Sequence, residues 1–151
     1  ASAPAGVGNY WRTDYLDELS GPSIATMVEQ AAGRASPFSQ VHLYHLGGAS
    51  ARVPDGATAL GRRDAPYVVS TIATWMDLAL AEPETSWVQR ASDAMRRHVS
   101  GGQYANFLGN EGHERVKAAY GPEKYARLAA LKSVWDPTNL FRINQNIRPS
   151  S

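Results

Sequence analysis

The chain has 151 residues, of which 43% are hydrophobic and 19% are charged, and its formal net charge is +1. These values describe one folded domain with a hydrophobic core, and they exclude a disordered chain. The small net charge argues against nucleic acid or a membrane surface as a partner. The absence of cysteine excludes disulfides and cysteine-bound metals.

The first half of the chain predicts a tail, an extended segment, a helix and two strands. Residues 1–9 are mostly small and are expected to form a flexible tail or linker, after which an aromatic-rich stretch is expected to be extended. A helix is predicted over residues 20–33, which begin with Ser-Gly-Pro and end on glycine, as helix starts and ends often do. Residues 38–46 alternate between the two sides of an extended backbone and predict a strand. We expect a neighbouring strand at residues 49–53.

The second half predicts a central strand and three helices. Residues 67–75 are apolar or small on both faces, as in a strand that has neighbours on either side. A helix is predicted from Pro83, because apolar residues then recur at helical spacing. Residues 103–108 are expected to be extended, and two further helices are expected at 111–120 and 122–136. The order of elements indicates the α+β class, with an antiparallel sheet flanked by helices.

Two histidines lie on the predicted strand at 38–46. His42 and His45 are three residues apart, which places them on opposite faces of a strand, so a shared metal ion is not expected. His45 lies at the end of the strand, before Gly47-Gly48. It is either a base that lines a pocket or a histidine with a purely structural role.

Two further groups of polar residues could bind a ligand. Tyr104 and Asn106 are two residues apart, so an extended backbone points both the same way, either toward a ligand or into a buried hydrogen-bonded pair. Asn144, Gln145 and Asn146 form a row of amides near the end of the chain. Such a row suits a flat, polar heterocycle, and it equally suits a tail that only pins the chain.

The motifs of common hydrolases and phosphate-binding proteins are absent from the sequence. There is no Gly-x-Ser-x-Gly nucleophile elbow. Gly47-Gly48 lacks the lysine and the following helix that a phosphate-binding loop requires. Chemistry by itself therefore indicates a folded α+β domain and no particular reaction.

Four segments, taken in order, resemble a known family. They read YWRTDYLDELS, HLYHLGGASARVPDGATALGRRDAPYVV, SGGQYANFLGNEG and AAYGPEKYARLAALKSVWDPTNLFRINQNIRP. Together they resemble the C-terminal third of a berberine-bridge-enzyme-like flavoprotein oxidase, within the wider group of FAD-linked oxidases related to vanillyl-alcohol oxidase. The last segment is the most specific, and the composition suggests a bacterial protein.

The resemblance implies a fragment of a two-domain enzyme. Such an enzyme binds FAD and oxidises a small organic molecule by hydride transfer to the flavin. Residues 10–102 would belong to the substrate domain, and residues 103–151 would be the C-terminal segment that returns to the FAD domain. The expected partners are therefore a small-molecule substrate and an N-terminal FAD-binding domain or chain. Without that part this chain is expected to be inactive and not to retain FAD. A cytoplasmic location is favoured, and secretion stays open because any leader would lie upstream of Ala1.

The resemblance also implies roles for particular residues. The strand that carries Leu43 and His45 would lie beside the flavin and the substrate, with His45 as the base of the pocket. Tyr104 would orient or deprotonate the substrate, while Asn106 and Phe107 would contact it. The three amides at 144–146 would meet the pyrimidine edge of the flavin. The alternative is a free-standing, non-catalytic binding or interaction module that kept the fold without the cofactor.

Overall fold

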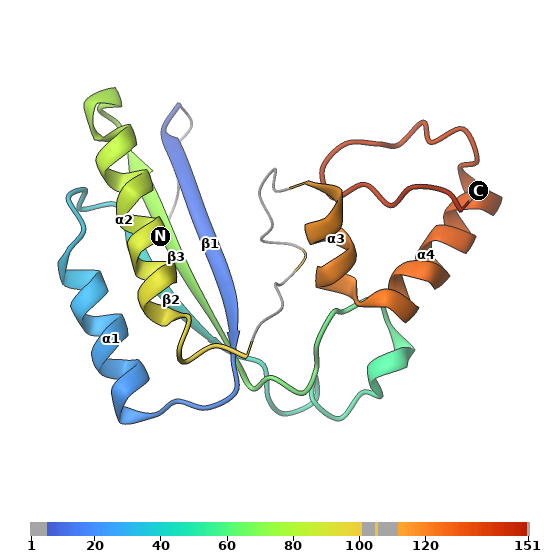
Figure 1. The fold of residues 1–151 in the computed structure, drawn as a ribbon, viewed down its shortest axis with the longest axis horizontal. Coiled ribbons are helices and arrows are strands. Elements are labelled where there is room, and N and C mark those ends of the chain that lie inside the picture. Colours follow the sequence, from blue (N-terminus) through green and yellow to red (C-terminus); the bar gives the residue numbers. More distant parts are fainter. Residues whose placement is uncertain (1–5, 101–104, 106–111, 151) are drawn as a thin grey trace.

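The structure is a computed structural model that describes residues 6–100, 105 and 112–150 (Figure 1). Its described part contains three strands and four α-helices, together with two short 3₁₀ turns. The elements in chain order are β1 (Gly8–Leu16), α1 (Gly21–Ala32), β2 (Gln40–His45), η1 (Asp55–Ala57), β3 (Tyr67–Trp75), η2 (Leu78–Leu80), α2 (Ala81–Met95), α3 (His113–Tyr120) and α4 (Pro122–Trp135).

The three strands form an antiparallel sheet in the order β1-β3-β2. The central strand, β3, is the one predicted at residues 67–75, and almost all of its side chains are buried. Its residues are apolar or small because each face of a central strand packs against other side chains. The predicted class, an antiparallel sheet with flanking helices, is confirmed.

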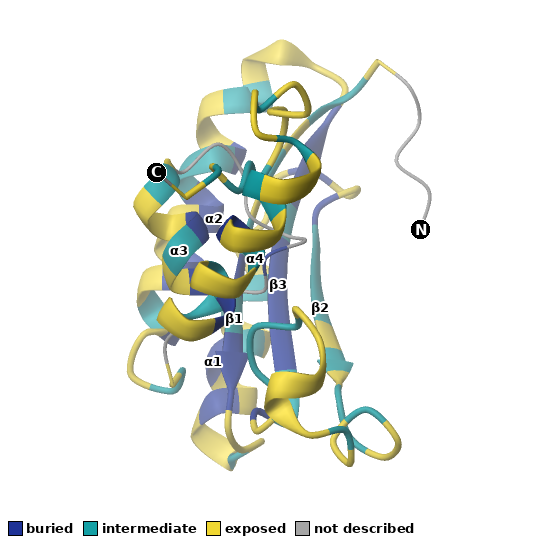
Figure 2. Ribbon diagram, turned by 90° about the vertical axis from the view of Figure 1, so that its right-hand side faces the viewer, coloured by how far each residue is buried: buried dark blue, intermediate teal, exposed yellow. Residues whose placement is uncertain are grey.

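Helices α1 and α2 cover one face of the sheet (Figure 1). Trp87 and Val88 of α2 pack against Ala73 and Trp75 of β3, and the Trp87 indole donates to the Gln30 carbonyl of α1 at 2.7 Å. Figure 2 shows the resulting core as a band of buried residues along the strands. Burial of large apolar side chains between helices and sheet is the main stabilising term of this layer.

Helix α1 begins and ends where the sequence predicts. The Ser20 hydroxyl accepts a hydrogen bond from the Ser23 amide, which satisfies one of the free amides at the helix start. Pro22 lies in the first turn, where a missing amide hydrogen costs nothing. Gly33 then follows the last helical residue. Local chemistry therefore suffices to place this helix.

Helices α3 and α4 lie on the other side of the sheet, together with the C-terminal segment (Figure 1). Gly121 separates them with φ of 79°, a left-handed conformation that favours glycine. Val116 and Ala119 of α3 form a small core with Ala105, against which Tyr125 of α4 packs. This helical pair has its own core instead of sharing that of α1 and α2.

Three predictions about the elements need correction. Residues 49–53 form a turn and not a strand, with the Arg52 amide donating to the Ala49 carbonyl at 3.3 Å. Helix α2 begins at Ala81 rather than Pro83, because proline is tolerated throughout the first helical turn. Strand β1 begins at Gly8, inside the predicted tail, because β3 extends far enough to pair with it.

Candidate functional site

The alternation of β2 sends its side chains to two different environments. His42 is opposite Ser70 of β3, and Ser70 is opposite Thr13 of β1, with the two hydroxyl oxygens 3.0 Å apart. We call this the His42 face, and it is turned away from α1 and α2. Its members are Trp11, Thr13 and Tyr15 of β1, Gln40, His42 and Tyr44 of β2, and Val68, Ser70 and Ile72 of β3.

The predicted residues Leu43 and His45 lie on the opposite face, which α1 and α2 cover. The His45 ring is exposed and lies against the Tyr67 ring, with 5.3 Å between their centroids. Leu43 lines an apolar groove of about 370 Å³ between β2 and α1. His42 and His45 are therefore on different faces, as the sequence predicts. The catalytic role of His45 and the substrate-binding role of Leu43 stay predictions.

A hydrogen-bonded row of side chains runs along β2 on the His42 face. His42 Nε2 lies 2.6 Å from Gln40 Oε1, and His42 Nδ1 lies 2.9 Å from the Tyr44 hydroxyl oxygen. All three side chains are partly buried. The imidazole thus has a partner at each nitrogen, in the geometry that fixes its orientation and tautomer.

The rest of the His42 face combines hydroxyl groups with aromatic rings. Thr13 and Ser70 are buried and satisfy each other. Trp11 is partly exposed at one end of the face. Arg62 lies over the Tyr15 ring, with its guanidinium carbon 5.5 Å from the ring centroid. A face with both hydrogen-bonding groups and flat rings can hold a polar organic molecule.

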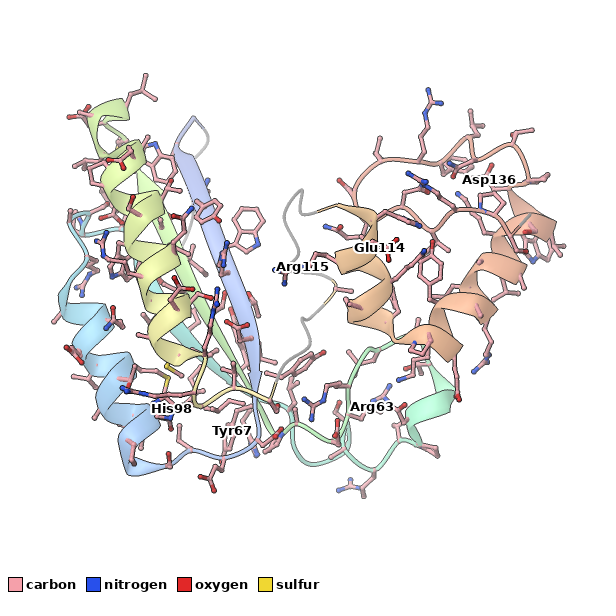
Figure 3. The ribbon with its side chains drawn as sticks, in the orientation of Figure 1. Arg63, Tyr67, His98, Glu114, Arg115 and Asp136 are labelled. Atoms are coloured by element: carbon pink, nitrogen blue, oxygen red, sulfur yellow. The ribbon has the colours of Figure 1, made fainter. Side chains whose placement is uncertain are left out.

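The helical pair contributes charge on the same side of the sheet. Figure 3 shows Arg115 extending from α3 toward the strands. His113, at the start of α3, lies with Nε2 3.2 Å from the Tyr125 hydroxyl of α4. Burial lowers the pKa of His113 from its ordinary value, and the nearby positive charges of Arg148 and Lys117 lower it further. The neutral imidazole is therefore the favoured form here.

The three predicted amides lie in the segment after α4. Asn144 is exposed and has φ of 58°, and its carbonyl accepts from the Asn146 amide at 2.9 Å. The side-chain oxygen of Asn146 is buried and has no hydrogen-bond partner among the described residues. The structure thus brings an accessible amide and an unsatisfied acceptor into one short loop with Gln145.

The loop that carries the amides begins at a carboxylate, Asp136, which is labelled in Figure 3. Asp136 follows α4 and accepts hydrogen bonds from Lys132 and from the Leu140 and Phe141 amides, the latter two at 2.7 and 3.1 Å. The bond from Lys132 is the main cause of the lowered pKa of Asp136. The negative charge therefore holds the turn that follows the helix.

Tyr104, Asn106 and Phe107 lie outside the described residues. Their neighbour Ala105 is described, and it is buried against Val116 and Ala119 of α3. The roles predicted for the three residues stay predictions.

The sequence reasoning missed the row formed by Gln40, His42 and Tyr44. The signal was present, because residues two apart on a strand point the same way. The same rule paired Tyr104 with Asn106. Only the packing of α1 and α2 decides which face of β2 is covered by helices.

The described residues show no metal site and no membrane span. Among residues 6–100, 105 and 112–150, no three His, Asp or Glu side chains gather as metal ligands would. No helix in that part of the chain has the length and apolar character needed to cross a bilayer.

One further cavity, of about 410 Å³, lies where η1 meets the turn between α3 and α4. Its walls include Asp55, Tyr120, Lys124 and Arg127. None of the residues predicted from the sequence lines it. The Lys124 and Arg127 side chains that line it already donate to loop carbonyls. We therefore interpret this cavity as a space between packed segments and not as a ligand site.

The comparisons with known proteins agree with one another. Residues 103–148 match the family described as berberine and berberine like. The chain is 28% identical over 140 residues to YvdP of Bacillus subtilis, an FAD-linked oxidoreductase. This match covers 93% of this chain and 30% of that protein. It is 27% identical over 142 residues to the aclacinomycin-N/aclacinomycin-A oxidase of Streptomyces galilaeus, covering 83% of this chain and 26% of that protein.

Solved structures agree with the sequence comparison. The 6-hydroxy-D-nicotine oxidase of Arthrobacter nicotinovorans is 27% identical, with a TM-score of 0.76 over 99% of this chain and 34% of that one. Berberine bridge enzyme from Eschscholzia californica has the same fold over 95% of this chain, with a TM-score of 0.78 and 20% identity, and 33% of that enzyme is covered.

The chain thus spans about a quarter to a third of the length of the proteins it matches. The resemblance predicted from the sequence is confirmed, and FAD is the cofactor that these relatives imply for the complete protein. Residues 103–148 thus match the berberine-like family, and the chain is similar over most of its length to one part of FAD-linked oxidoreductases of that group.

Proposed function

We propose that this chain is the C-terminal, substrate-binding part of an FAD-dependent oxidoreductase that oxidises a small organic molecule by hydride transfer to the flavin. Residues 10–102 form the substrate-domain portion, and residues 103–151 form the segment that returns to the FAD-binding part. The rest of the protein, or a second chain, supplies that FAD-binding part.

The observation that carries the proposal is the exposure of large apolar side chains at the end of α4 and in the segment that follows it. Trp135 and Ile143 are 83% and 81% exposed, and Phe141 is 76% exposed. Asp136 fixes the turn between them, so these side chains are held outward instead of folding back. A large exposed apolar patch is uncommon on a monomeric protein and often marks a docking site. Docking of the FAD-binding part onto this segment accounts for them.

The residues of the C-terminal loop fit the edge of a flavin in their chemistry. The buried Asn146 oxygen lacks a donor, and a flavin ring carries an N–H group at its pyrimidine edge. The exposed amide of Asn144 offers both a donor and an acceptor. Asn144, Gln145 and Asn146 would hold that edge once the Asn146 amide turns outward. The flavin supplies the acceptor for a hydride.

The protein's own part in the reaction is to bind, orient and deprotonate the substrate. Tyr104, Asn106 and Phe107 remain the proposed contacts from the C-terminal segment. On the sheet, the His42 face provides hydroxyls, an imidazole and aromatic rings on the side where α3 lies. Leu43 and His45 lie on the helix-covered face, so His42 and Tyr44 are the stronger candidates for contact with the substrate.

The alternative is a non-catalytic module that works without cofactor. Such a module would be expected to present a polar surface where the FAD-binding part would otherwise dock. The exposure of Trp135, Phe141 and Ile143 favours the oxidoreductase fragment instead.

The test is the intact mass and the visible absorption spectrum of the full-length protein under native conditions. A flavin spectrum is expected, and a colourless full-length protein would contradict the proposal. Anaerobic mixing with (R)-6-hydroxynicotine, aclacinomycin N and a chitooligosaccharide then follows, since relatives or structural neighbours are named as oxidases of such compounds. Bleaching of the flavin by one of them identifies the substrate class.

A further inference from the structure

We propose that Gln40, His42 and Tyr44 form a proton relay in which Tyr44 is the general base and His42 receives its proton. The relay rests on the proposed function. The Tyr44 oxygen takes a proton from a substrate O–H or N–H group while the proton of Tyr44 moves to His42 Nδ1. The substrate's hydride leaves for the flavin, so the substrate loses one proton and one hydride in all.

The orientation of the Gln40 amide is fixed by its other partner. Gln40 Nε2 donates to the Phe38 carbonyl at 3.2 Å. The amide oxygen is thereby left facing His42 Nε2 at 2.6 Å. An amide oxygen can only accept, so His42 Nε2 must carry a hydrogen.

The tautomer of His42 follows from that hydrogen. A neutral imidazole with hydrogen on Nε2 has a lone pair on Nδ1. His42 Nδ1 lies 2.9 Å from the Tyr44 oxygen, so the phenol must donate to it. The Tyr44 proton already points at the atom that would receive it, as general-base catalysis requires.

The row also suits the state after proton transfer. The imidazolium keeps its Nε2 hydrogen on Gln40 and donates its new Nδ1 hydrogen to the Tyr44 oxygen, which now carries the proton taken from the substrate. Gln40 is uncharged and makes the same bond in both states, so it acts as a positioning residue and not as a proton acceptor. This division of roles parallels a nucleophile, a histidine and an orienting third group.

The relay is anchored at both ends by buried structure. Ser39, which directly precedes Gln40, donates its hydroxyl to the carboxylate of Glu84, and Glu84 is fully buried. At the other end, the Tyr44 ring packs against the buried Tyr15 and Val68. The hydrogen-bonded groups are therefore held on a rigid strand, which favours a defined proton path.

The first experiment reads the position of the proton without any substrate. Full-length protein labelled with ¹⁵N-histidine is studied by long-range ¹H–¹⁵N correlation, and His42→Gln identifies the signals. Hydrogen on Nε2 and a lone pair on Nδ1 are expected. Gln40→Leu should shift His42 toward a mixture of tautomers, Gln40→Glu should restore the Nε2 hydrogen, and the control His98→Gln should change neither. Hydrogen on Nδ1 in the unaltered protein would overturn the relay.

The second experiment follows anaerobic reduction of the flavin by a compound from the panel of (R)-6-hydroxynicotine, aclacinomycin N and a chitooligosaccharide. Tyr44→Phe and His42→Gln should each slow reduction by about 10²-fold or more. The double variant should be no slower than the worse single variant, because the two residues act as one unit. Losses that multiply would overturn the relay. A protein without flavin would contradict the proposed function, while the tautomer measurement would still decide the relay.

Discussion

The ammonium group of Lys124 lies 2.7 Å from Asp55 Oδ1, joining the first turn of α4 to the connection between β2 and β3. The same group donates to the carbonyls of Leu60 and Gly61, at 2.8 and 2.9 Å. Lys124 is buried, whereas the Asp55 side chain is 66% exposed. The two partners therefore contribute differently to the attachment of the helical pair.

Replacing Lys124 should cost much more stability than replacing Asp55. Lys124→Met leaves two carbonyls without their donor, and about 2 kcal/mol of unfolding free energy should be lost. Asp55→Asn weakens a mostly exposed ion pair and should cost less than about 1 kcal/mol. Urea denaturation of the full-length protein measures both. Equal losses would mean that the ion pair, and not the carbonyl contacts, holds the helix.

Glu84 should be among the most sensitive positions of the sheet and the helices that cover it. Its carboxylate accepts from the Ala35 and Ser36 amides, both at 2.7 Å, and from the Ser39 hydroxyl. Glu84→Ala leaves buried donors without an acceptor and should cost about 3 kcal/mol or more. Glu84→Gln keeps an acceptor for the amides and should cost roughly 1 kcal/mol.

The control for Glu84 is Glu82→Gln, an exposed change on the same helix. It should alter the unfolding free energy by less than about 0.5 kcal/mol. A loss at Glu82 similar to that at Glu84 would show that acidic charge in the first turn of α2 matters more than the buried bonds.

His113 should make the protein less stable in mild acid. Its pKa is lowered in the folded state by burial and by Arg148 and Lys117, from an ordinary value of 6.5. The unfolded chain therefore takes up the proton first as the pH falls below about 6.5, and stability falls until the folded pKa is passed. Between pH 8 and 5, the melting temperature of His113→Gln should decline less than that of the unaltered protein. Parallel declines would exclude His113 as the cause.

Asp136 should lose its hold on the C-terminal turn in stronger acid. Its pKa is lowered chiefly by the bond from Lys132, so its contribution is present above the ordinary value of 3.8 and is lost as the pH falls through the folded pKa. Asp136→Asn should loosen this turn at all pH values above the folded pKa of Asp136, where the unaltered protein carries the charged carboxylate. Limited proteolysis after Leu140 or Phe141 should be faster in the variant, and an unchanged rate would show that the turn needs no carboxylate.

A comparison of the two strand histidines decides which face meets the substrate. His42→Gln should slow reduction of the flavin by a panel compound by about 10²-fold or more. His45→Gln, on the helix-covered face, should change the rate much less. A loss at His45 with little effect at His42 would instead support the base predicted from the sequence.

The sequence by itself located most of the elements. Ser20 and Gly33 bound α1, Gly121 separates α3 from α4, and the strand at 67–75 has the composition of a central strand. These features depend on local backbone chemistry and on the period of apolar residues, which a sequence carries directly. The ordered C-terminal motif likewise sufficed to predict the family.

Only the tertiary structure decided which side of β2 is covered by helices. Alternation separates His42 from His45, but it gives no sign of which of them α1 and α2 will leave uncovered. That choice follows from the packing of Trp87 and Val88 against β3. Both residues are far from β2 in the sequence. The pairing of Lys124 with Asp55 is equally non-local, because a buried charge takes whatever acceptors the assembled fold brings within reach.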